Sequence, residues 1–125
     1  MEIKKIKIGI KSEEQALEEF AVAFKKVQKG ENIQKSKGTF FENVKALRSF
    51  MTPRRIELIR TIHQKKPASA YELARMVGRD IKSITTDLGI LGRIGLVQLE
   101  KEAGQTGEKI HPFVDYDTLQ VEIAV

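Results

Sequence analysis

Residues 69–93 read SAYELARMVGRDIKSITTDLGILGR and predict two short helices joined by a tight turn. A Ser-x-x-Glu capping box begins the first helix, and Gly78 is a residue at which helices typically end. Asp80 is a helix-capping residue, so a second helix is expected over residues 80–94. The apolar residues of this helix recur at helical spacing and predict one buried side: Ile81, Ile84, Leu88 and Leu91.

The opposite side of the second helix is polar and has no acidic residue at its centre. One lysine and three hydroxyl groups lie on this side or on its flanks: Lys82, Ser83, Thr85 and Thr86. In a helix that enters the major groove of DNA, lysine can donate to guanine and hydroxyl groups can bond to several bases. The alternative is an ordinary solvated face, but the order of the surrounding elements favours DNA contact.

That order is helix, helix, helix and hairpin. Thr52-Pro53 predicts the start of the first helix, and residues 96–111 predict two strands around a Gly-Gln-Thr-Gly turn. A helix-turn-helix with such a hairpin, or wing, places further polar groups beside DNA. We expect supporting contacts from the helix starts, the turn and the wing: Arg54, Arg55, Ser69, Tyr71, Arg79, Lys101 and Lys109. The alternatives are plain surface charge for the two neighbouring arginines and packing for the tyrosine.

The two ends of the chain alternate between apolar and polar residues, as strands do. Ile6, Ile8 and Ile10 carry the first alternation and residues 121–125 the last. The first strand is basic and the last is acidic, so we expect them to share a sheet as an antiparallel pair, within one chain or exchanged between two. An amphipathic helix over residues 13–29 is expected to lie on this sheet and to form a dimer contact.

These elements divide the chain into three parts. Residues 1–38 are a strand–helix extension and linker, and a candidate dimerisation element. Residues 39–111 are the DNA-binding domain, which opens with a short helix behind a Thr39–Glu42 capping box. Residues 112–125 are a C-terminal strand segment that packs with the first strand. The expected fold class is α+β, mainly α: a winged helix-turn-helix with an N-terminal strand–helix extension and a C-terminal strand.

Composition limits the classes of function. The 125 residues are 41% hydrophobic and 31% charged, and their net charge of +5 suits a nucleic-acid partner. There is no cysteine, and His63 and His111 have no partner at ligand spacing, so we expect no metal site. Asp115 and Asp117 are interpreted as surface carboxylates, and we expect no catalytic residue, no cofactor and no enzyme activity. The chain shows no secretory signal and no membrane-spanning segment, which fits a cytoplasmic protein.

Four central segments carry a family resemblance: TPRR at 52–55, YELAR at 71–75, VGRD at 77–80 and LGRIGLV at 91–97. With them the chain resembles the winged helix-turn-helix transcriptional regulators of prokaryotes, most closely a small archaeal and bacterial group, some of which act as antitoxins. The HPFVDYD segment fits the ending of that group. The chain departs from a regular recognition helix at Gly89 and Gly92, because each glycine costs about 1 kcal/mol of helix propensity relative to alanine.

The resemblance implies sequence-specific binding of double-stranded DNA by a homodimer. We therefore expect a transcriptional repressor with the 80–94 helix in the major groove and the 96–111 hairpin as its wing. The alternative is an antitoxin or other interaction module that binds a partner protein, such as a cognate toxin. In that case DNA binding would be autoregulatory or absent.

Overall fold

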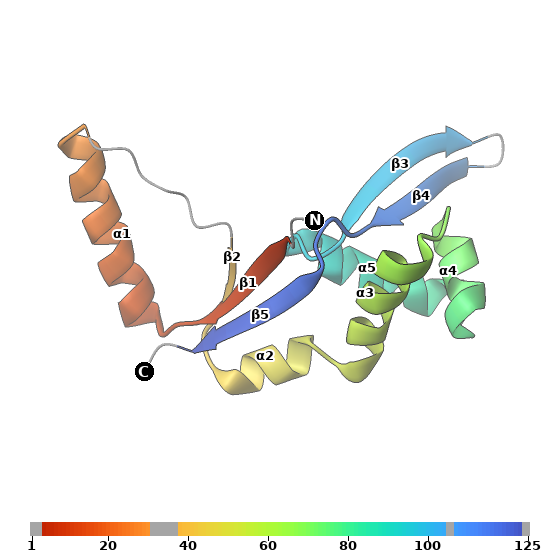
Figure 1. Cartoon of the computed structure of the whole chain (residues 1–125), viewed down its shortest axis with the longest axis horizontal. Helices are drawn as coiled ribbons and strands as arrows, with labels where there is room; N and C mark the ends of the chain where they lie inside the picture. The colour runs from red at the N-terminus through yellow and green to blue at the C-terminus, as the bar shows by residue number, and fades with distance from the viewer. Residues whose placement is uncertain (1–3, 31–37, 105–106, 124–125) are drawn as a thin grey trace. The chain divides into compact units, whose positions relative to one another are not determined.

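The computed structural model describes residues 4–30, 38–104 and 107–123, which fold into two units (Figure 1). One unit comprises the described residues up to Phe50 and those from Thr118 onward; the other spans Met51–Asp117. Within these residues the fold is α+β and mainly helical, with five helices and five short strands. The expected fold class is confirmed at this level.

The second unit consists of α3 (Pro53–Lys65), α4 (Ala70–Val77), α5 (Ile81–Arg93) and the antiparallel hairpin of β3 (Gln98–Gly104) and β4 (Gly107–Phe113). The side chains of Thr52, Ser69 and Asp80 each accept a hydrogen bond from the backbone N–H three residues on, so the predicted starts of these helices are confirmed. Gly78 ends α4 with a φ of 69°, a left-handed conformation that glycine adopts without strain.

The core of this unit lies between the three helices and the base of the hairpin. Helix α5 contributes Ile84, Leu88 and Leu91, which are at most 1% exposed. Apolar residues of α3, of α4 and of the segment before β3 complete the core: Leu58, Ile59, Ile62, Leu73, Leu96 and Val97. Because one whole side of α5 is buried, its opposite side faces solvent.

After β4, Tyr116 holds the chain to the same unit. Its side chain is buried, and its hydroxyl donates a 2.6 Å hydrogen bond to the backbone carbonyl of Leu96. Burial raises the pKa of this hydroxyl above its ordinary value of 10.0. The bond therefore joins the segment after the hairpin to the segment before it.

The first unit is built on a parallel sheet whose described strands are, in order, β2 (Gly38–Phe41), β1 (Lys5–Ile10) and β5 (Thr118–Ile123). The prediction that the two ends share a sheet is confirmed, within one chain, but the predicted antiparallel direction is wrong: Ile8 pairs with Val121 in parallel. A parallel pair needs a long connection, and here that connection contains the whole 51–117 unit. One expected charge pair forms, with 3.9 Å between Lys7 Nζ and Glu122 Oε2.

The predicted capping box at Thr39 and Glu42 is wrong. Residues 38–41 pair with β1 as a strand, and the helix α2 (Val44–Phe50) begins only after Asn43. The Asn43 side-chain oxygen accepts a 2.8 Å hydrogen bond from a backbone N–H in the first turn of α2. Pairing with a neighbouring strand outweighs a local capping signal, which is a weak preference.

Helix α1 (Glu13–Gln28) begins with a capping box formed by Ser12 and Gln15. None of the residues of α1 is buried, so the expected packing of this helix on the sheet is not observed. The predicted linker at residues 31–38 lies outside the described residues, except for Gly38, which is in β2.

Removal of the Tyr116 hydroxyl tests its bond to Leu96. We expect Tyr116→Phe to lower the free energy of unfolding by about 1–2 kcal/mol, because a buried carbonyl loses its donor. The raised pKa further predicts that the native chain loses stability as the pH rises above 10.0, the unfolded-state value, and that the variant loses less. Urea denaturation at neutral pH and above pH 10 measures both effects.

Tyr71→Phe is the matched control, because Tyr71 is 68% exposed. We expect this variant to stay within about 0.5 kcal/mol of the native chain. Equal losses in the two variants would contradict the role given to Tyr116.

Candidate nucleic-acid interface

The solvent side of α5 carries the polar residues that the sequence placed there. Lys82 and Thr86 are exposed, while Ser83 and Thr85 on the flanks are half-buried. On the other side of the helix, Ile84 is fully buried. The predicted apolar side of α5 is confirmed for Ile84, Leu88 and Leu91, whereas Ile81 in the first turn is only half-buried.

The hydroxyl groups on this side already use their hydrogens inside the helix. Thr86 Oγ1 donates to the carbonyl of Lys82 at 2.9 Å, and Thr85 Oγ1 donates to the carbonyl of Ile81 at 2.9 Å. Ser83 Oγ donates to Asp80 Oδ1 at 2.8 Å. Each hydroxyl oxygen can therefore only accept a hydrogen bond from a ligand, and each threonine also carries a methyl group.

Asp80 places a carboxylate at the N-terminus of α5. It accepts from the backbone N–H of Ser83 at 3.0 Å as well as from the Ser83 hydroxyl. The hydroxyl bond to Ser83 is the main reason that the pKa of Asp80 lies below its usual value. The carboxylate is thus charged at neutral pH and complements the positive end of the helix dipole.

An ion-pair network that the sequence did not predict connects α5 to the residues around it. Asp87 Oδ1 accepts from Arg55 Nε at 3.2 Å, and Asp87 Oδ2 accepts from Arg79 Nη2 at 2.8 Å. All three side chains are less than a fifth exposed, so solvent screens these charges far less than surface charges. The network joins α3, the turn between α4 and α5, and α5 itself.

This network changes the expected roles of two arginines. The sequence predicts that Arg55 and Arg79 contact the phosphate backbone, but both side chains bind Asp87. Arg54 is exposed at the start of α3 and remains available to a ligand. Arg55 and Arg54 cannot be distinguished from the sequence, because the partner of Arg55 is 32 residues away.

The start of α4 carries two further candidates. Tyr71 is exposed and is not part of the core. The Ser69 hydroxyl accepts the backbone N–H of Glu72 at 3.2 Å, so it serves as the helix cap. The Glu72 carboxylate completes a variant of the capping box by accepting from the N–H of Ala68 at 3.3 Å rather than from the cap residue itself.

The two wing lysines are both exposed but lie on opposite faces of the hairpin. Lys101 is opposite Ile110 and Lys109 is opposite Glu102, and cross-strand partners share a face. The face of Lys101 also carries Leu99, which packs toward α5. The two lysines therefore cannot approach one flat surface together. The predicted turn between the strands falls in part on residues 105–106, which lie outside the described residues.

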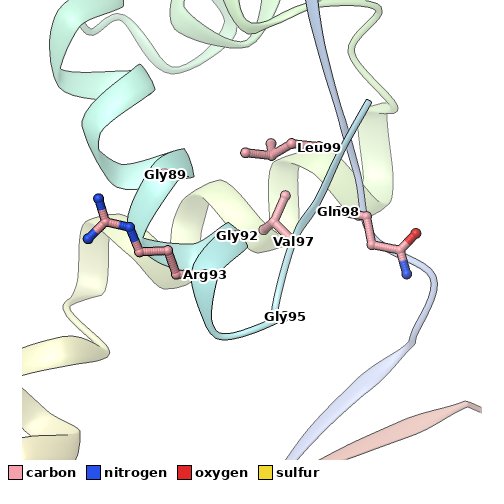
Figure 2. A pocket seen from close by; sticks show the side chains of 7 residues that line it. All are labelled: Gly89, Gly92, Arg93, Gly95, Val97, Gln98 and Leu99. Carbon is pink, nitrogen blue, oxygen red and sulfur yellow. The ribbon is translucent and has the colours of Figure 1, made fainter. Parts of the chain in front are cut away.

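A shallow depression of about 500 Å³ adjoins the C-terminal half of α5 (Figure 2). Its lining residues are Gly89, Gly92, Arg93, Gly95, Val97, Gln98 and Leu99. Figure 2 shows the Arg93 side chain extending away from β3. Arg93 is exposed and shares the solvent side of α5 with Lys82 and Thr86, so it adds a cation that was not among the predicted contacts.

The two glycines of α5 differ in their surroundings. A Cβ atom at Gly92 would lie 3.0 Å from Leu99 Cδ1, so this glycine allows the hairpin to approach α5 closely. A Cβ atom at Gly89 would meet nothing within 4 Å. Close packing therefore explains why residue 92 is a glycine. It does not explain Gly89, where the helix backbone on the solvent side has no side chain over it.

The described residues contain no group of three or more potential ligands that could hold a metal ion. The two histidines are separate: His63 Nε2 lies 2.9 Å from Asp117 Oδ1, and His111 Nδ1 lies 3.7 Å from Glu100 Oε2. No helix in the described part of the chain is both long and apolar enough to cross a membrane.

The sequence model of the HVO_A0114 family matches residues 50–121, which is more than half of the chain. The chain belongs to the HVO_A0114 family. The matched range includes the entire 51–117 unit, with α5, the ion-pair network and the hairpin. No curated protein matches the chain.

The Asp87 network predicts a strong effect of a nearly isosteric substitution. We expect Asp87→Asn to lower the free energy of unfolding by roughly 3 kcal/mol, because two largely buried guanidinium groups lose their counter-charge. Asp115→Asn, at an exposed carboxylate, is the matched control and should change stability by less than about 0.5 kcal/mol. Similar midpoints for both variants in thermal denaturation would contradict the network's role.

The two glycines of α5 make a second matched pair. We expect Gly89→Ala to raise the free energy of unfolding by about 0.5–1 kcal/mol, because alanine favours the helix and its methyl group meets open space. Gly92→Ala gains the same helix propensity, but its methyl group forces the Leu99 side chain to move. The Gly92→Ala variant should therefore be less stable than the Gly89→Ala variant. Chemical denaturation of both variants checks this order, and the reverse order would refute it.

Proposed function

We propose that residues 51–117 form a winged helix-turn-helix that binds double-stranded DNA sequence-specifically, and that the chain acts as a dimeric transcriptional repressor. In this proposal α5 enters the major groove and the β3–β4 hairpin is the wing. The observation that carries the proposal is the exposed Lys82 and Thr86 side of α5, held outward by the buried Ile84, Leu88 and Leu91.

The size and charge of this surface support the proposal. The major groove is about 12 Å wide and accepts one α-helix. Lys82 near the start of α5 and Arg93 at its end place a cation at both ends of the solvent side, while Arg54 and Tyr71 are exposed at the starts of the neighbouring helices. These groups suit phosphate or base contacts, and the net charge of +5 favours a polyanion.

The internal hydrogen bonds of the hydroxyl groups specify what α5 would recognise. With their hydrogens donated to the helix backbone, Thr85 and Thr86 offer acceptors and methyl groups. Acceptors match the amino groups of adenine and cytosine, and methyl groups match the thymine methyl. The ammonium group of Lys82 can donate to the O6 and N7 acceptors of guanine. Arg55 and Arg79 bind Asp87 and thereby restrain the orientation of α5.

A second candidate function is binding of a partner protein, such as a cognate toxin, with DNA binding autoregulatory or absent. The exposed apolar side of α1 favours this alternative, because an uncovered apolar stripe marks an interaction surface. Co-purification of a neighbour-encoded protein by a chain that does not bind DNA would support it over the first.

The DNA proposal is tested by binding to the DNA upstream of the protein's own gene. We expect specific binding that weakens with salt by about 10³–10⁵-fold between 50 and 200 mM if six to ten phosphates are contacted. Lys82→Ala combined with Thr86→Ala should weaken specific binding by at least about tenfold, because each removes a base contact worth roughly 1–3 kcal/mol. Fluorescence anisotropy at fixed salt measures the change.

Lys65→Ala is the control for loss of one positive charge, at an exposed position at the end of α3. It should leave the preference for the specific sequence unchanged. The double variant should lose more affinity for the specific sequence than for random DNA. If its two losses are equal, as expected for Lys65→Ala, α5 does not read the sequence.

A further inference from the structure

The apolar side of α1 is uncovered in the described part of the chain. Leu17, Phe20, Phe24 and Val27 are between 55% and 69% exposed, and the Phe20 and Phe24 rings stack with 6.5 Å between their centroids. A helix of this length has little stability in water unless its apolar side is packed. The stripe therefore needs a partner surface.

The spacing of these four residues identifies the kind of partner. They follow one another at intervals of three, four and three, which is the a/d seam of a two-helix coiled coil. The positions that flank the seam are small, Ala16, Ala21 and Ala23, so a second helix can approach closely. A helix with the same kind of stripe fits this side, and a second copy of α1 has one.

The charges of α1 select the direction of the second helix. Glu13, Glu14, Glu18 and Glu19 lie in its first half, and Lys25, Lys26 and Lys29 follow its centre or lie just beyond its end. A parallel pair would place like charges together, which is destabilising. An antiparallel pair places the acidic first half of one copy alongside the basic second half of the other.

We propose that α1 pairs antiparallel with α1 of a second copy of this chain, around a two-fold axis that crosses the seam between Phe20 and Phe24, level with residue 22. About this centre Phe20 packs against Phe24 of the other copy, and Leu17 against Val27. A two-fold axis makes both halves of the contact identical, as in most homodimers. The inference concerns assembly and does not depend on DNA binding.

The absence of cysteine from the chain allows a direct test by disulfide trapping. Leu17→Cys and Val27→Cys chains, one of them with a mass tag, are mixed, allowed to exchange partners and oxidised. In the antiparallel pair residue 17 faces residue 27 of the other copy, so the mixed disulfide should form. Two copies of residue 17 would be about 15 Å apart along the axis, beyond the limit of about 7 Å for a disulfide.

Val22→Cys controls for random collision. Residue 22 is on the side of α1 away from the seam and is 54% exposed, so it should cross-link no faster than a surface cysteine. Mass spectrometry of the products decides the outcome. Self-linked Leu17→Cys chains would indicate a parallel pair, and a mixed disulfide no more abundant than the Val22→Cys product would exclude the α1 contact; either overturns the proposal.

A charge exchange tests the pairing without cross-linking. Glu18→Lys combined with Glu19→Lys, and separately Lys25→Glu combined with Lys26→Glu, should each weaken the dimer by about threefold to tenfold, because each change brings halves of like charge together. The variant that carries all four substitutions restores opposite charges and should return to near the native dissociation constant. Sedimentation equilibrium measures all three variants, and an unchanged dimer in both reversed variants would overturn the antiparallel direction. Because this readout is assembly, its failure is separate from failure to bind DNA.

Discussion

The arrangement of the 51–117 unit depends on how α5 is fixed. Its apolar residues are buried, the helix packs against α4 and β3, and Asp87 on its flank binds Arg55 and Arg79. Rotation of α5 about its axis would expose Ile84, Leu88 and Leu91 to water, at a cost of about 1.5–3 kcal/mol for each side chain. The two ion pairs add restraints of defined geometry. Apolar burial and ion pairs together determine which residues of α5 face solvent, on which the proposed recognition of DNA depends.

The same network accounts for an apparent excess of basic residues near α5. Asp87 offsets one of the two positive charges of Arg55 and Arg79, and both side chains are less than a fifth exposed, whereas Lys82 and Arg93 are exposed. The effective basic surface is therefore smaller and more localised than the composition suggests. Its boundaries follow from which side chains are engaged within the protein rather than from their number.

Much of the 51–117 unit could be predicted from the sequence because its signals are local. A capping residue lies within four residues of the N–H it satisfies, and a buried stripe repeats every three or four residues. Asp87 escaped prediction because Arg55 is distant along the chain and Arg79 is two turns away. Strand direction and the replacement of the Thr39 cap by β2 likewise depended on long-range pairing.

The exposed side of α1 illustrates a different limit. The helical spacing of its apolar residues predicts an apolar side but not the surface that covers that side. The sheet of the same unit does not bury α1, so its apolar residues and its separated acidic and basic halves become information about a partner. Since α1 and α5 belong to different units, assembly and DNA recognition would use separate surfaces. Substitutions on one can then be expected to leave the chemistry of the other intact.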